Sequence, residues 1–270
     1  MNRFKNISIL TKIQVLLLIG AIGLLLSPVI ASRYFVTHNY EVIADFVTHE
    51  TTESELEEFD KYNESLTDEN FYAEDPFSRY VDVETNEPKT VGVLHLPQID
   101  EELAIYEDTN DQTLAKGVGL LAGTHYPTGK INQTTVVTGH RGTRDATIFQ
   151  NIDKMAVGDV FWVDNGVDKL YYEIYDNKIV LPHQTDLLRI VPDQDTFILL
   201  SCETPDIKKG LNTHRILLFA KRVDAPKDEP EIAPKVDNQF KFKLFTTVAV
   251  ALVGLIILII RKELKRHTNK

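Results

Sequence analysis

The chain of 270 residues has a single cysteine, Cys202, and fewer basic than acidic side chains. One cysteine excludes an intramolecular disulfide and a zinc site built from several cysteines. With 29 Lys and Arg against 40 Asp and Glu, the formal net charge is −11, which argues against binding to nucleic acid phosphates. The hydrophobic share of 43% is ordinary for a globular protein and excludes wholesale disorder. The length suits one domain with extensions, or two domains.

Two long hydrophobic runs lie near the ends of the chain. Residues 13–31 and 244–260 contain no charged side chain, and basic residues flank both on their outer sides. A bilayer core takes roughly 20 apolar residues as a helix, so both runs are predicted membrane spans. The positive flanks predict cytoplasmic termini and an exterior location for the intervening residues. For the first run, a signal peptide cleaved after Ala31 is the alternative, although a signal core is shorter, at about 7–15 residues.

The charge separates along the chain in the same way. The two ends hold ten basic residues and one acidic residue, which leaves 19 basic against 39 acidic residues between them, a net −20. Such a charge favours solubility of an exterior segment. Five segments are predicted: a cytoplasmic N-terminus with an anchor (1–31), a helical extension (32–90), a β-rich domain (91–223), a linker (224–240), and a second span with a basic cytoplasmic tail (241–270).

The pattern of apolar residues changes near residue 90, from helical spacing to short strand-like runs. Before it, apolar residues follow helical spacing, and Thr52 with Glu55 forms a capping box at the start of a helix. After it, two short helical turns and eight short runs rich in β-branched and aromatic residues predict a barrel or a sandwich. The predicted strands are 91–96, 103–106, 119–122, 134–138, 160–163, 170–180, 196–201 and 215–221.

Three reactive side chains stand at the ends of predicted strands. Cys202 ends one run, His140 ends another after Gly139, which we expect to let the backbone turn, and Arg215 opens a third. A thiolate nucleophile, a general acid/base and a permanent cation are a set suited to acyl transfer. A buried, unreactive thiol is the alternative for the cysteine, because free cysteine is often buried.

The residues around these side chains resemble the three catalytic blocks of the sortases, transpeptidases of Gram-positive cell surfaces. The blocks are Thr138–Gly142, Leu199–Cys202 and Asn212–Arg215, and further similarity extends over roughly residues 91–222. The resemblance implies a mainly β, closed barrel of the sortase type with about eight strands and short helices, preceded by the helical extension. It implies Cys202 as nucleophile, His140 as general acid/base and Arg215 as oxyanion stabiliser, with neither cofactor nor metal.

The segments outside the barrel resemble those of class C, the pilus-assembling sortases. Asp75, Pro76 and Phe77 are similar to the lid motif of that class, and a helical extension and a second membrane span accompany it. An ordinary turn is the alternative for the lid motif. The sequence departs from the class between Cys202 and Arg215, where twelve residues stand in place of a shorter loop.

The class implies that the donor is a surface or pilin protein with an Leu-Pro-x-Thr-Gly-like signal and the acceptor a pilin lysine. Two alternatives stay open: a sortase of another class with a peptidoglycan cross-bridge amine as acceptor, and a two-span binding or scaffold protein without activity. Arg141 is a second candidate for the oxyanion cation. The histidines expected to be structural or exposed are His95, His125, His183 and His214.

Overall fold

The computed structural model describes residues 9–48, 51–67, 88–141, 148–202, 214–228 and 239–268. The chain divides into two compact units, one of residues 1–37 with 236–270 and one of residues 38–235. The first unit contains most of α1 (Ile9–Thr48) and all of α4 (Gln239–Thr268). Both predicted hydrophobic runs are therefore helical.

Neither long helix satisfies the requirements of a membrane span. In the part of the chain that the structure describes, the helices contain no stretch that is long and apolar enough to cross a bilayer. The spans predicted for residues 13–31 and 244–260 are thus not confirmed by the structure and stay a prediction.

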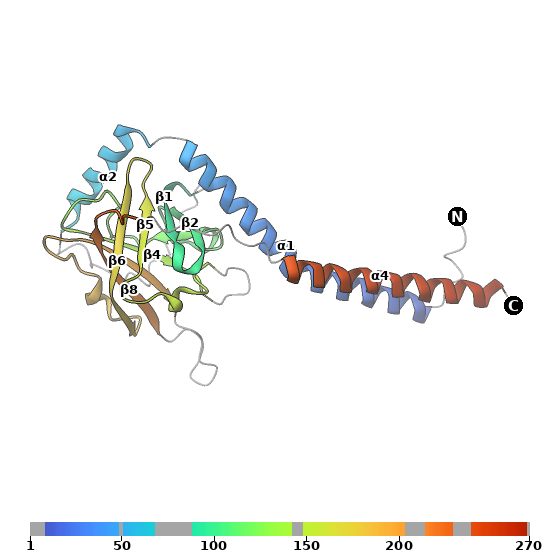
Figure 1. The fold of residues 1–270 in the computed structure, drawn as a ribbon. Coiled ribbons are helices and arrows are strands. Elements are labelled where there is room, and N and C mark those ends of the chain that lie inside the picture. The colour runs from blue at the N-terminus through green and yellow to red at the C-terminus, as the bar shows by residue number, and fades with distance from the viewer. Residues whose placement is uncertain are drawn as a thin grey trace. The chain divides into compact units, whose positions relative to one another are not determined.

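The second unit is built on a closed barrel (Figure 1). Its strand order is β1-β2-β3-β4-β7-β8-β6-β5, and pairing of β1 with β5 closes the sheet. The β2–β3 and β4–β7 pairs are parallel, and the other pairs are antiparallel. The strands are β1 (Thr90–Leu96), β2 (Glu101–Tyr106), β3 (Val118–Leu120), β4 (Gln133–Gly139), β5 (Val160–Asp164), β6 (Lys169–Val180), β7 (Asp195–Cys202) and β8 (Arg215–Val223).

Short helices connect several of these strands, as predicted. They are η2 (Pro97–Ile99), α3 (Asp111–Leu114), η3 (Ile152–Lys154) and η4 (Thr185–Leu188). The mainly β fold and the closed barrel of eight strands are confirmed, and the sandwich alternative is wrong because the sheet has no free edge between β5 and β1.

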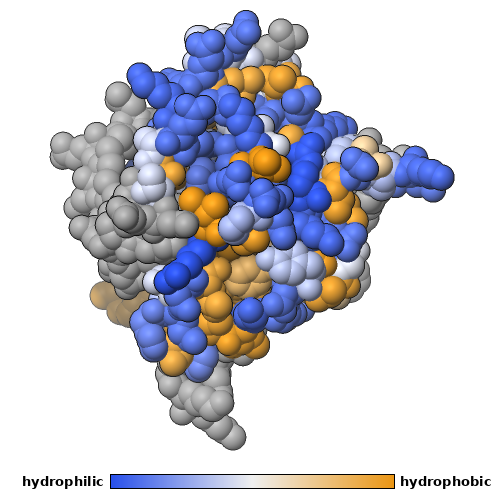
Figure 2. All heavy atoms as spheres, turned by 90° about the vertical axis from the view of Figure 1, so that its left-hand side faces the viewer, coloured by the Kyte–Doolittle hydropathy of each residue, from blue (hydrophilic) through white to orange (hydrophobic). Residues whose placement is uncertain are grey.

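Aromatic side chains fill part of the barrel core. Phe161, Tyr172 and Phe197 are fully buried, and the centroids of their rings lie 5.1–5.7 Å apart. Contacts of this kind combine large apolar burial with favourable ring geometry. The face of the barrel in Figure 2 is mostly hydrophilic, with hydrophobic residues gathered in separate patches.

The helical extension packs on the barrel through specific contacts. In α2 (Glu53–Ser65), the predicted capping box forms, because Thr52 accepts from the Glu55 amide and its own amide donates to the Glu55 carboxylate. Phe59 stacks on Tyr126 with 4.3 Å between ring centroids. The side chain of Asn63 bonds the N–H and the C=O of Tyr126, at 2.9 and 3.0 Å. These contacts attach α2 to the segment that precedes β4.

The last turns of α1 pack on β1 and β2. Asn39 donates to the carbonyl of Glu102 at 2.8 Å, and its side-chain oxygen accepts from the amide of Ala104 at 3.4 Å. Ile43 is buried in a cluster with Val93 and Ala104. Part of the helical extension thus contributes to the packing of the domain.

Candidate functional site

The strand order brings three predicted site residues to one rim of the barrel. The parallel strands β4 and β7 are in register, with Gly139 opposite Ser201, so the next residues along them are His140 and Cys202. On the other side of β7, Cys202 pairs directly with Arg215, the first residue of β8. Three adjacent strands therefore carry a thiol, an imidazole and a guanidinium at the same end.

The residue before His140 is a glycine for reasons of space. A Cβ at position 139 would lie 2.9 Å from the ring of Phe149 and 3.1 Å from a methyl of Val118. Gly139 is part of β4, and its φ is not positive. The expectation that it turns the backbone is thus wrong: the glycine lets an aromatic ring pack against the strand just before the histidine.

Hydrogen bonds hold the backbone at this rim. The carbonyl of His140 accepts from the amide of Phe149 at 3.1 Å. The carbonyl of Gly139 accepts from the hydroxyl of Ser201 at 2.8 Å. The half-buried Arg215 donates from Nη1 to the carbonyl of His214 at 3.2 Å. The half-buried positions of His140 and Arg215 leave part of each residue accessible from the rim.

The alternative cation, Arg141, is engaged elsewhere. It is buried, its guanidinium lies 2.6 Å from the carboxylate of Asp153, and its Nε donates to the carbonyl of Gln150 at 3.3 Å. These contacts join Arg141, directly after the histidine, to η3 through Asp153. This geometry favours Arg215 as the cation that serves the site.

Other histidines of the barrel have structural surroundings. The buried His125 has its Nδ1 3.1 Å from the amide of Thr134, and burial lowers the pKa of its imidazole. His95 stacks on Trp162 with 4.8 Å between ring centroids. His183 is exposed on the loop after β6. His214 is half-buried directly before Arg215.

Some predicted features lie outside the described residues. The lid residues Asp75, Pro76 and Phe77 fall in residues 68–87, and most of the chain between Cys202 and Arg215 falls in residues 203–213. Among the residues that are described, no group of three His, Cys, Asp or Glu side chains is arranged to hold a metal ion.

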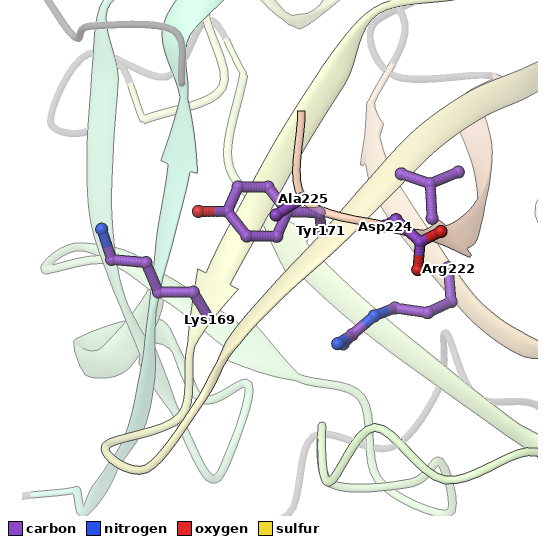
Figure 3. A pocket seen from close by; sticks show the side chains of 6 residues that line it. Lys169, Tyr171, Arg222, Asp224 and Ala225 are labelled. Carbon is purple, nitrogen blue, oxygen red and sulfur yellow. The ribbon is translucent and has the colours of Figure 1, made fainter. Parts of the chain in front are cut away.

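A pocket of about 380 Å³ opens at the other end of β8 (Figure 3). Arg222 lines it and pairs with Tyr172 of β6, whereas the rim residue Arg215 pairs with Cys202. The two arginines are seven residue steps apart along the strand, which is about 23 Å. The pocket is therefore separate from the rim. Its lining residues are Lys169, Tyr171, Arg222, Val223, Asp224 and Ala225.

The carboxyl of Asp195 is buried next to this pocket and was not predicted from the sequence as a residue of interest. Asp195, the first residue of β7, is 3% exposed and accepts from the Tyr172 hydroxyl at 3.0 Å. Burial raises the pKa of Asp195 to about 6, although the bond from Tyr172 and the charge of Arg222 oppose the shift. In the sequence, Asp195 is an acidic residue directly before a predicted core strand. An acidic residue in that position is equally typical of an exposed turn, so its burial could not be predicted.

Comparison with known proteins identifies the family to which this fold belongs. The family model of the sortase domain matches residues 94–223, which include the end of β1 and all of β2 to β8. Sortase C-1 from Actinomyces oris is 33% identical, and the superposition covers 63% of this chain and 97% of that one, with a TM-score of 0.53. This chain belongs to the sortase family. Sortases are cysteine transpeptidases, and the chain is thus an enzyme of that kind.

Two further sortases show the range of the similarity. The Group B Streptococcus Pilus Island 1 sortase C2 is 30% identical, with a TM-score of 0.55 over 64% of this chain and all of that one. Sortase D of Bacillus subtilis (strain 168) is 31% identical over 132 residues, which is 49% of this chain. The match spans 63% of the length of Sortase D.

Proposed function

We propose that this sortase cleaves an Leu-Pro-x-Thr-Gly-like sorting signal between Thr and Gly and transfers the acyl group to an amine. Cys202 is the nucleophile, His140 the general acid/base and Arg215 the group that stabilises the oxyanion. The observation that carries the proposal is the pairing of Cys202 with Arg215 next to the end of the His140 strand.

The first half of the reaction forms a thioester. The thiolate of Cys202 attacks the carbonyl carbon of the signal threonine, and the carbonyl electron pair moves to the oxygen. The guanidinium of Arg215 stabilises that negative charge, because arginine stays protonated at any working pH. When the C–N bond to glycine breaks, the imidazolium of His140 gives its proton to the departing amine.

The second half returns the enzyme to its starting state. An acceptor amine attacks the thioester carbon and gives one proton to the imidazole of His140. The C–S bond then breaks, and Cys202 leaves as a thiolate while the new amide forms. No cofactor is needed in this scheme because the thioester conserves the acyl energy.

We propose class C as the more specific assignment, with a pilin lysine as acceptor and Asp75, Pro76 and Phe77 as a lid. Support comes from the helical extension docked on the barrel and from the likeness to sortases C, one of which is named for a pilus island. The match to Sortase D shows that the similarity is not confined to sortases C. The second candidate is therefore a sortase of another class that uses another amine, such as that of a peptidoglycan cross-bridge. Incubation of the enzyme and donor with a pilin, and separately with a cross-bridge analogue, discriminates between them by which conjugate forms.

We also propose that the hydrophobic runs of α1 and α4 anchor the enzyme at a Gram-positive cell membrane, with both termini cytoplasmic and the barrel outside. Support comes from the basic flanks and from aliphatic side chains exposed in both helices, such as Leu24 at 80% and Val250 at 70%. Such surface is unfavourable in water. Membranes washed with alkaline carbonate should retain the protein, and its release by the wash would contradict the anchors.

The transfer reaction tests the roles of the rim. With a fluorescent sorting-signal peptide and an amine acceptor, Cys202→Ala should form no conjugate. His140→Ala and Arg215→Ala should each lose at least about 10²-fold in turnover, as expected for a proton-transfer group and an oxyanion donor. Arg141→Ala, the control for an arginine adjacent to the histidine, should retain the reaction in the fraction that folds. Transfer by the Cys202 variant would overturn the proposed function.

A further inference from the structure

One side-chain hydrogen bond joins the ends of β4 and β7 directly below the rim. The hydroxyl of Ser201 donates to the carbonyl of Gly139 at 2.8 Å, and Ser201 is 1% exposed. These two residues form the pair of the β4–β7 ladder nearest the rim. Gly139 is followed directly by His140, the proposed general acid/base, and Ser201 is followed directly by Cys202, the proposed nucleophile.

The strand end that carries His140 is held by three contacts. The Phe149 ring packs against Gly139, the Phe149 amide donates to the His140 carbonyl at 3.1 Å, and the Ser201 hydroxyl holds the Gly139 carbonyl. The first two contacts tie the strand end to the segment before η3. Of the three, the bond from Ser201 alone runs to the strand that carries Cys202.

We propose that Ser201 is a positioning residue, whose hydroxyl sets the separation between the backbones of His140 and Cys202. This inference rests on the proposed function, in which His140 and Cys202 are the reacting pair. A reacting pair misplaced by about 1 Å loses on the order of 10²-fold in rate. A thiol next to an imidazolium also ionises at lower pH than an isolated thiol, so the separation affects the reactivity of Cys202 without any substrate.

The single cysteine makes a direct test possible, because a thiol reagent labels Cys202 only. The rate of alkylation by iodoacetamide is measured against pH for the full-length chain and for Ser201→Ala and Ser201→Thr, together with kcat and KM for a sorting-signal peptide. Ser201→Ala should shift the alkylation profile toward that of an isolated thiol and lower kcat roughly ten- to hundredfold with little change in KM. Ser201→Thr keeps a hydroxyl and should restore the wild-type profile.

A matched control separates positioning from stability. Thr134 lies at the other end of β4, is fully buried, and donates from its hydroxyl to the carbonyl of Arg189 at 3.0 Å. Thr134→Val should lower the unfolding temperature but leave the alkylation profile unchanged. If Ser201→Ala retains the wild-type profile and kcat, or if Thr134→Val reproduces its effects, the inference is wrong.

Two further outcomes are also decisive. If Ser201→Ala fails to fold, Ser201→Thr carries the test, since a folded threonine variant with the profile of an isolated thiol contradicts the role of the hydroxyl. If the wild-type enzyme forms no thioacyl adduct, the proposed function fails, and the alkylation profiles still decide whether Ser201 positions the pair.

Discussion

The buried carboxyl of Asp195 is expected to make the barrel less stable as the pH rises. Its pKa is about 6 in the folded protein against an ordinary value of 3.8, because burial disfavours the charged form. The folded state therefore holds this proton more tightly than the unfolded state does. The contribution of Asp195 to stability is therefore most favourable below pH 3.8, falls between pH 3.8 and 6, and stays lower above that range.

The magnitude follows from the size of the shift. Each pKa unit corresponds to about 1.4 kcal/mol, so a difference of about two units costs about 3 kcal/mol when the carboxylate is fully ionised. Asp195→Asn removes the ionisation and keeps an oxygen that accepts from Tyr172. Any cost of the new amide group is the same at every pH. Relative to wild type, the variant should gain about 2 kcal/mol in unfolding free energy between pH 4 and pH 7.5.

Urea unfolding provides the assay, with the fluorescence of Trp162 as the probe because it is the single tryptophan and is buried in β5. The exposed Asp186→Asn serves as the control and should follow the wild-type pH dependence. The reasoning is refuted if the difference in unfolding free energy between Asp195→Asn and wild type is the same at both pH values.

Three other predictions concern the surroundings of the site. Gly139→Ala places a methyl against the aromatic ring packed on this strand, and thermal unfolding should report a loss of about 1–3 kcal/mol together with reduced turnover. Asn63→Ala removes the acceptor of the Tyr126 N–H and one of the two donors to the Tyr126 carbonyl, which keeps its bond from the Thr128 amide. The variant should cost about 1–3 kcal/mol, with faster hydrogen exchange in α2 while exchange in β7 is unchanged. Phe77→Ala should speed labelling of Cys202 by a thiol reagent, and an unchanged rate removes Phe77 from the site.

The strands and the reactive side chains could be predicted from local patterns. Short apolar runs bounded by turn residues mark buried strands whatever their partners are, and Cys202, His140 and Arg215 stood out because each lies at a strand end. The class of fold then followed from the number of strands and from the resemblance.

The pairings themselves could not be predicted, because they depend on contacts between distant residues. Nothing near Ser201 in the sequence indicates that its hydroxyl meets Gly139, 62 residues earlier. The ion pair of Arg141 with Asp153, on which the proposal of Arg215 as the oxyanion cation partly rests, is also seen only in the fold. The burial of Asp195 likewise results from packing on β6.

The proposed mechanism requires that Cys202 forms a thioester with the threonine of a sorting signal. Its direct test is the intact mass of the full-length enzyme after exposure to an Leu-Pro-x-Thr-Gly peptide without acceptor amine. We expect an added mass equal to the acyl fragment through threonine, located on the tryptic peptide that contains Cys202. The added mass should be lost on addition of an amine and should not form with Cys202→Ala. If the enzyme transfers the peptide without this adduct, or if the Cys202→Ala variant forms the adduct, Cys202 is not the nucleophile.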